Sequence, residues 1–246
     1  MTITRHPGIR DIFQYTWQRS LGSLSLTIVF VCTAIFLLVA MADMLHLVSK
    51  RIVFTYLGIS YYGVIEQCWY WQFITAPLLH TSIAHLLFNM LALWMLGPNL
   101  EEKLGKKGYI LLSIISAFPA MMAVLIANWK TGTIVVGYSG VIYGILVAQA
   151  IFFPDRRIVI FALFPIKMKY AVLLFAAIEF YLTISPEGTV VSHVSHLFGA
   201  AGAFFYLITR KMISNRRQMK HLKKKRTKVL TASRKSRIER TVPKRL

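Results

Sequence analysis

The stretch LSLTIVFVCTAIFLLVAM occupies residues 24–41 and contains no charged side chain. A transmembrane helix needs about 20 consecutive, predominantly apolar residues. Backbone amides and carbonyls find no partner in lipid, so a spanning segment of this kind is helical. Of the 246 residues, 56% are hydrophobic and 15% are charged, whereas soluble domains carry about 25% charged residues. These values exclude an ordinary soluble enzyme and a disordered chain, and two cysteines exclude a disulfide scaffold.

Further apolar segments follow this first one along the chain. They are residues 78–96, 109–127, 139–153, 170–184 and 190–209. We therefore predict an all-α membrane protein with six transmembrane helices. The chain divides into a head (1–20), a membrane domain (21–209) and a basic tail (210–246).

The net charge of +20 is concentrated in the tail, where residues 210–246 hold 16 Lys and Arg and a single acid. Basic residues are enriched in cytoplasmic loops. Head, tail and alternate loops together carry 26 basic residues, and the opposite side carries three, so we expect both termini in the cytoplasm. A compact six-span chain without a targeting extension is typical of bacteria, which indicates the inner membrane. The tail is expected to bind anionic lipid; nucleic acid, suggested by a pI near 10.3, is the weaker alternative.

The segment between the first two predicted spans, residues 45–76, is rich in Trp and Tyr. These residues favour the membrane–water interface, and the segment is too long for a simple connector. We expect it to fold and to lie partly in the outer leaflet. The triplet Ala40-Met41-Ala42 resembles a signal-peptide cleavage site. Because the apolar run is long and Asp43 follows directly, we expect the first span to be retained.

Several polar residues fall within the predicted spans and should lie at one depth, near the extracytoplasmic face. They are His80, His85 and Asn89 on the second span, Ser139 on the fourth, and His193 and His196 on the sixth. Polar groups inside a membrane are costly and are therefore functional candidates.

The tetrapeptide Gly137-Tyr138-Ser139-Gly140 lies where the fourth span begins. A serine between small residues at a helix start has an accessible hydroxyl, and the backbone N–H groups there can stabilise an oxyanion. The alternative interpretation is a serine N-cap with a packing glycine. Tyr143 lies one helical turn further, on the same face as Ser139.

Small residues at helical spacing occur on both the fourth and the sixth span, and such strips let membrane helices approach closely. The strip on the fourth span is Gly140, Gly144 and Ala148, and the strip on the sixth span is Ser192, His196, Gly199 and Ala203. If they face each other, Ser139 meets His196. His85 and Asn89 share one face of the second span and could donate hydrogen bonds to an oxyanion; interhelical hydrogen bonding is the alternative.

Together these motifs resemble the rhomboid family of intramembrane serine proteases over about residues 71–203. The resemblance rests on HTSIAHLLFN (80–89), GYSG (137–140) followed by Tyr143, His196 with Gly199, and the charged turn LEEKLG (100–105). It implies cleavage of transmembrane segments of other membrane proteins near the extracytoplasmic face, without a cofactor. Many rhomboid proteins have Trp-Arg in the loop where this chain has Trp71-Gln72, which puts the anchoring of the loop in question.

The resemblance also assigns roles to single residues. Ser139 is the implied nucleophile and His196 the general base, in a dyad without a third acid. Tyr143 is implied to stack on His196. His85, Asn89 and the backbone N–H of Ser139 are implied to form the oxyanion hole, supported by Gly137 and Gly140. His80, Glu101 and Gly199 are implied to be structural.

Other functions stay open at this point. A metal site could use His80, His85, His193, His196 and Glu179, but it leaves Ser139 without a role. A non-catalytic relative would lack the serine or the histidine, and a transporter would need half-helices or a repeat. His193 is a rival base, although only His196 is followed by glycine three residues later. Glu179 is expected to extend its carboxylate to the outer surface, with a role in substrate gating as the alternative.

Overall fold

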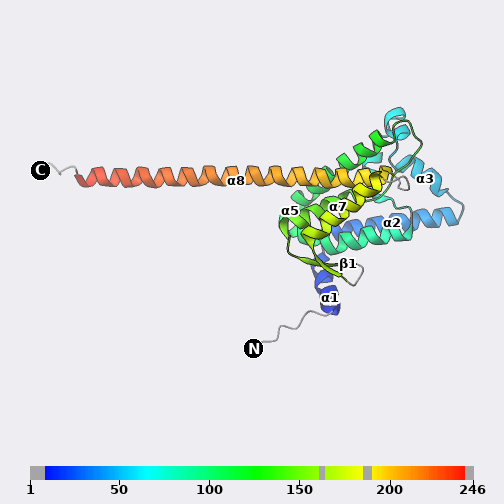
Figure 1. Cartoon of the computed structure of the whole chain (residues 1–246), viewed down its shortest axis with the longest axis horizontal. Coiled ribbons are helices and arrows are strands. Elements are labelled where there is room, and N and C mark those ends of the chain that lie inside the picture. Colours follow the sequence, from blue (N-terminus) through cyan, green and yellow to red (C-terminus); the bar gives the residue numbers. More distant parts are fainter. Residues whose placement is uncertain (1–8, 161–163, 185–189, 242–246) are drawn as a thin grey trace. The chain divides into compact units, whose positions relative to one another are not determined.

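The computed structural model describes residues 9–160, 164–184 and 190–241. Contacts divide the chain into two units, residues 1–204 and 205–246, and the first unit contains every candidate site residue. Helices dominate the described residues (Figure 1). The elements are α1 (Ile9–Ser20), α2 (Leu24–Met44), α3 (Lys50–Leu57), the π-helical turn η1 (Tyr62–Glu66), α4 (Gln72–Thr75), the 3-10 turn η2 (Ala76–Leu78), α5 (Ile83–Ala127), α6 (Ser139–Phe152), β1 (Arg157–Ile160), β2 (Phe164–Lys167), α7 (Met168–Ile184) and α8 (Val190–Thr241).

Each of the six apolar segments found in the sequence overlaps a helix, and α5 includes two of them. Within the described residues, α2 and α5 are long and apolar enough to cross a bilayer, and α6 is a shorter apolar helix. Helix α5 packs against α2 and α6, and α6 packs against α7.

The charged turn after the second predicted span interrupts α5 and holds the start of α2. Gly105 has φ 72° and ψ 159°, which ends the helical geometry and requires the freedom of glycine. Nearby, the buried Glu101 accepts a hydrogen bond from the backbone N–H of Leu24 at 2.8 Å. A carboxylate at a helix N-terminus is electrostatically favourable. Arg19 and Glu102 form an ion pair beside it, so the turn is attached to both α1 and α2.

The connection between α6 and α7 contains an antiparallel hairpin of β1 and β2, with Arg157 opposite Lys167. The all-α prediction is therefore wrong for this segment. Residues 158–160 are Ile, Val and Ile, which favour strands, and pairing satisfies backbone groups in a segment too short to span a bilayer. Next to the hairpin, hydrogen bonds from Lys169 and Lys167 lower the pKa of Asp155.

The segment between α2 and α5 is folded around a cluster of aromatic rings. The Trp69 ring stacks on those of Tyr56 and Trp71, with centroids 4.7 and 5.9 Å apart, and meets Tyr62 edge-on at 5.8 Å. Such pairs contribute beyond the apolar area that they bury. The cluster connects α3, η1 and the start of α4.

Gln72 anchors this segment from inside. Its side chain is fully buried, and its Nε2 donates to the carbonyl oxygen of Thr55 at 3.0 Å while its Oε1 accepts from the backbone N–H of Ser60 at 3.2 Å. Trp71 adds a hydrogen bond from Nε1 to the carbonyl oxygen of Tyr56 at 2.9 Å. The segment is therefore well anchored although Gln72 replaces the arginine found in many rhomboid-like sequences. The Gln72 carboxamide satisfies backbone groups that the loop would otherwise leave without partners.

Helices α6 and α8 meet backbone to backbone at Gly140 and Gly199. A Cβ on Gly199 would meet the carbonyl oxygen of Gly140 and would lie 2.9 Å from its carbonyl carbon. Further along, a Cβ on Gly144 would lie 3.2 Å from the Cβ of Ala203. The two helices thus approach as closely as small residues allow.

Gln72→Ala should destabilise the protein by about 1–3 kcal/mol, because it leaves buried backbone groups without partners. The midpoint of thermal unfolding in detergent measures the effect. Gln67→Ala is the matched control, since Gln67 is exposed in the same segment. Equal midpoints for the two variants would contradict the anchoring role.

Gly199→Ala should cost about 1–3 kcal/mol, because the new methyl group forces α8 away from α6. Gly132→Ala serves as control, since a Cβ there has nothing within 4 Å. Thermal unfolding of both variants tests the contact, and a Gly199→Ala variant as stable as the control would show that the helices are free to separate.

Candidate active site

Ser139 is the first residue of α6 and follows a turn that only glycine fits. Gly137 has φ +123°, and a Cβ there would lie 2.6 Å from Cε1 of His85. The Gly137 N–H donates to the carbonyl oxygen of Ala76 at 2.9 Å, which ties the turn to η2. In the first turn of a helix the backbone N–H groups lack intrahelical partners, so the N–H of Ser139 is available to a bound group.

The structure brings Ser139 on α6 and His196 on α8 into hydrogen-bonding contact. Ser139 Oγ lies 2.7 Å from His196 Nε2. The His196 ring is stacked on Tyr143, with centroids 4.5 Å apart and planes 8° from parallel. A hydroxyl next to an oriented imidazole is the arrangement of an activated nucleophile.

His85 and Asn89 lie on the neighbouring face of α5, next to the Gly137 turn. Asn89 is buried, and its Nδ2 has no hydrogen-bond partner among the residues that the structure describes. A Cβ on Gly137 would lie 2.7 Å from His85 Nε2 and 3.7 Å from Asn89 Nδ2, so both nitrogens face the turn. A buried donor without a partner is costly, which makes Asn89 Nδ2 a candidate donor to a bound ligand.

Two contacts hold His85 in this orientation. Its Nδ1 lies 3.1 Å from Thr81 Oγ1, which leaves Nε2 directed at the Gly137 turn. The buried His80 ring packs against it at an angle of 66°, with centroids 5.0 Å apart. His80 therefore contacts the site through His85.

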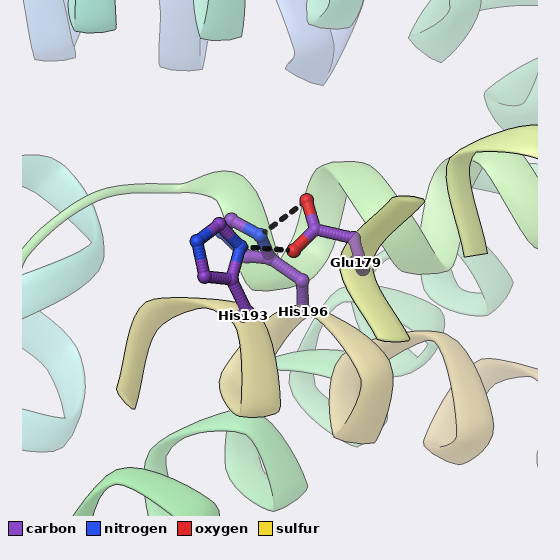
Figure 2. A group of neighbouring side chains, drawn as sticks. All are labelled: Glu179, His193 and His196. Carbon is purple, nitrogen blue, oxygen red and sulfur yellow. Dashed lines mark hydrogen bonds and ion pairs between the residues drawn. The ribbon is translucent and has the colours of Figure 1, made fainter. Parts of the chain in front are cut away.

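Glu179 on α7 is the site residue whose position the sequence analysis missed. It is only 6% exposed, and Figure 2 shows both imidazoles of α8 facing its carboxylate. Oε2 lies 2.6 Å from His193 Nδ1 and Oε1 lies 3.0 Å from His196 Nδ1. The Tyr143 hydroxyl also donates to Oε1. The expected extension to the outer surface is wrong, because three polar groups satisfy the carboxylate inside the protein.

One signal in the sequence could have located Glu179. It is the only acid within a predicted span, and His193 and His196 are one helical turn apart on another span. A buried carboxylate needs donors, and these histidines were the nearest donors in depth.

Of the five residues considered for a metal site from the sequence, the structure brings three together. Glu179, His193 and His196 place their ligand atoms within 4.8 Å of one another and could hold a metal ion, whereas His80 and His85 pair with each other. Both Nδ1 atoms already lie at hydrogen-bonding distance from the carboxylate. The cluster is therefore satisfied as it stands.

A pocket opens directly beside Ser139. It is lined by small and medium-sized residues, among them Ala76, Pro77, Ala120, Val136, Gly137 and Ser195. Its apolar walls and the adjacent hydroxyl suit a small, uncharged side chain.

Comparison with known proteins agrees with these observations. Residues 67–212 match the Rhomboid domain. A rhomboid protease GlpG from Pectobacterium atrosepticum is 30% identical over 137 residues, which cover 56% of this chain and 46% of the relative. A rhomboid protease GlpG from Yersinia pestis is 28% identical over 141 residues, which cover 57% and 47%. This chain therefore matches about half the length of these relatives. Since the domain match covers more than half of the chain, the protein belongs to the rhomboid family.

Proposed function

We propose that this protein is an intramembrane serine endopeptidase that cleaves transmembrane segments of other membrane proteins near the extracytoplasmic face. The observation that carries the proposal is the 2.7 Å contact between Ser139 Oγ and His196 Nε2 at the start of α6. Membership of the rhomboid family and similarity to proteins named rhomboid protease support it.

In the proposed reaction, Ser139 Oγ attacks the carbonyl carbon of the scissile peptide bond while His196 Nε2 takes the hydroxyl proton. The same nitrogen then gives this proton to the leaving amide nitrogen, and an acyl-enzyme remains on Ser139. Water then attacks the ester carbonyl carbon while His196 Nε2 takes its proton. His196 returns that proton to Ser139 Oγ as the ester bond breaks, and the carboxylic acid product leaves. These steps use side chains and water, and they require no cofactor.

The negative charge of the tetrahedral intermediate would be stabilised by His85, Asn89 and the backbone N–H of Ser139. Among the described residues the Nδ2 of Asn89 has no partner, which supports this role, because the intermediate would supply one. The glycine at position 137 leaves room for the oxyanion between α5 and the start of α6. The adjacent pocket has a volume of only about 30 Å³, which favours substrates with a small residue at the cleavage site.

The proposed setting is a bilayer crossed by six helices, with both termini in the cytoplasm and the aromatic segment between α2 and α5 at the outer interface. A bacterial inner membrane fits this arrangement. The basic residues after position 209 would bind anionic lipid headgroups on the cytoplasmic side, and nucleic acid is the weaker alternative.

Ser139→Ala and His196→Asn should each reduce cleavage of a model transmembrane substrate in detergent by several orders of magnitude, because nucleophile and base act as a unit. A fluorophosphonate probe should label the wild type and not Ser139→Ala. His46→Asn, at an exposed position between α2 and α3, should stay fully active. An active, folded Ser139→Ala variant would end the serine-protease proposal.

Asn89→Ala should lower kcat by about 10²–10³-fold and leave KM almost unchanged, because the oxyanion exists only in the transition state. Steady-state kinetics with the same substrate separate the two constants. Asn99→Ala, at a buried position on the same helix, should leave kcat unchanged. A change confined to KM in Asn89→Ala would instead indicate a contact with the substrate itself.

A further inference from the structure

We infer that Glu179 is a positioning residue for His196. Ser139, His196 and Glu179 then form one hydrogen-bonded series, and His193 and Tyr143 hold the carboxylate of Glu179. The inference rests on the proposed function and departs from the dyad without an acid that the family resemblance implies. Its basis is the convergence of three polar side chains on one buried carboxylate (Figure 2).

The two nitrogens of His196 have different partners. Nε2 lies 2.7 Å from Ser139 Oγ, and Nδ1 lies 3.0 Å from Glu179 Oε1. An ionised carboxylate can only accept a hydrogen bond, so it holds the ring proton on Nδ1. Nε2 is then unprotonated and free to take the proton of Ser139. Glu179 thereby selects the tautomer that the proposed reaction needs.

The contact between Glu179 and His196 also stabilises the positive charge that forms on the His196 ring during the reaction. When Nε2 takes the serine proton, the ring becomes an imidazolium next to the carboxylate. The proton stays on His196, which later delivers it to the leaving nitrogen, and Glu179 remains ionised throughout. In a site shielded from water this attraction is stronger than it would be in solution.

His193 and Tyr143 hold the carboxylate in place. His193 Nδ1 lies 2.6 Å from Oε2, and the Tyr143 hydroxyl donates to Oε1. Tyr143 also stacks on the His196 ring, so one side chain orients both the imidazole and its acid. The carboxylate on α7 is thus connected to α6 and to α8.

A buried carboxylate in an apolar helix is a poor choice for stability alone, because desolvation offsets most of what its pairing contributes. The Glu179 carboxylate contacts His196 Nδ1, while Nε2 on the other side of the same ring contacts Ser139. A tie between helices would not require that alignment, whereas orientation of a general base does.

The decisive variant is Glu179→Gln, which keeps the size of the side chain and can present an N–H to His196 Nδ1. That contact favours the wrong tautomer, so kcat for a model transmembrane substrate in detergent should fall by about 10²–10⁴-fold. KM and the unfolding midpoint should change little, and the rate of fluorophosphonate labelling should fall in parallel with kcat. Glu66→Gln, an exposed acid between α2 and α5, is the matched control and should behave as the wild type.

A second pair of variants tests the support of the carboxylate and remains informative if Glu179→Gln does not fold. His193→Ala should lower kcat by about 10-fold, which is the expected effect of losing one hydrogen bond to a charged group. His193→Gln restores an N–H donor and should recover most of the loss. A purely steric role for His193 would instead predict that His193→Leu, which is similar in size to His193→Gln but has no donor, recovers kcat to the same extent.

The outcomes separate this inference from the proposed function. If folded Glu179→Gln has the kcat of the wild type, or changes only in KM, the positioning role is overturned. The proposed protease function survives that result as long as Ser139→Ala is inactive. An active Ser139→Ala overturns the proposed function itself. Loss of wild-type activity with a chelator, restored by Zn²⁺, would show that Glu179, His193 and His196 bind metal, which also overturns the inference.

Discussion

The backbone contact between α6 and α8 at Gly140 and Gly199 is the constraint on which the site depends. Serine and histidine side chains are short, so their polar atoms meet only if the helices that bear them nearly touch. With Gly140 against Gly199, Ser139 Oγ lies 2.7 Å from His196 Nε2. A methyl group at either glycine would push the two helices apart, and would thereby separate Ser139, the neighbour of Gly140, from His196, which lies about one helical turn from Gly199.

A second constraint is that polar groups in an apolar surrounding must find partners within the protein. Glu179 on α7 illustrates it, because its carboxylate contacts His193 and His196 on α8 and Tyr143 on α6. Asn89, beside the turn before Ser139, departs from this rule: its Nδ2 is buried without a partner among the described residues. Satisfied groups build the scaffold of the site, and the unsatisfied donor marks where a reacting oxygen would be held.

The surrounding segments keep this arrangement in register. Gln72 satisfies the backbone of the aromatic segment on one side of the site, and Gly137 connects that segment to the nucleophile turn through Ala76. Within α5, just before the break at Gly105, Glu101 holds the start of α2. Gln72 and Glu101 thus each use one polar side chain to supply hydrogen bonds to backbone groups, whereas Gly137 uses its own backbone N–H.

The positions of the helical segments could be predicted from the sequence, because apolar length and the need for internal backbone hydrogen bonds are properties of the chain read in order. The alignment of Ser139 with His196 could be inferred too, since small residues at helical spacing mark the faces that approach closely. The hairpin of β1 and β2 was missed because a short β-branched run between spans resembles an ordinary loop.

By itself, then, the sequence determined which segments are helical, which faces carry small or polar residues and which motifs place the chain among rhomboid proteins. Only the tertiary structure decided that Glu179 turns inward to His193 and His196, that Gln72 anchors the aromatic segment, and that the His80 ring packs against His85. The rotation of a helix about its axis decides which side chains meet. That rotation follows from packing against neighbours far away in the chain, which hydropathy along one segment does not encode.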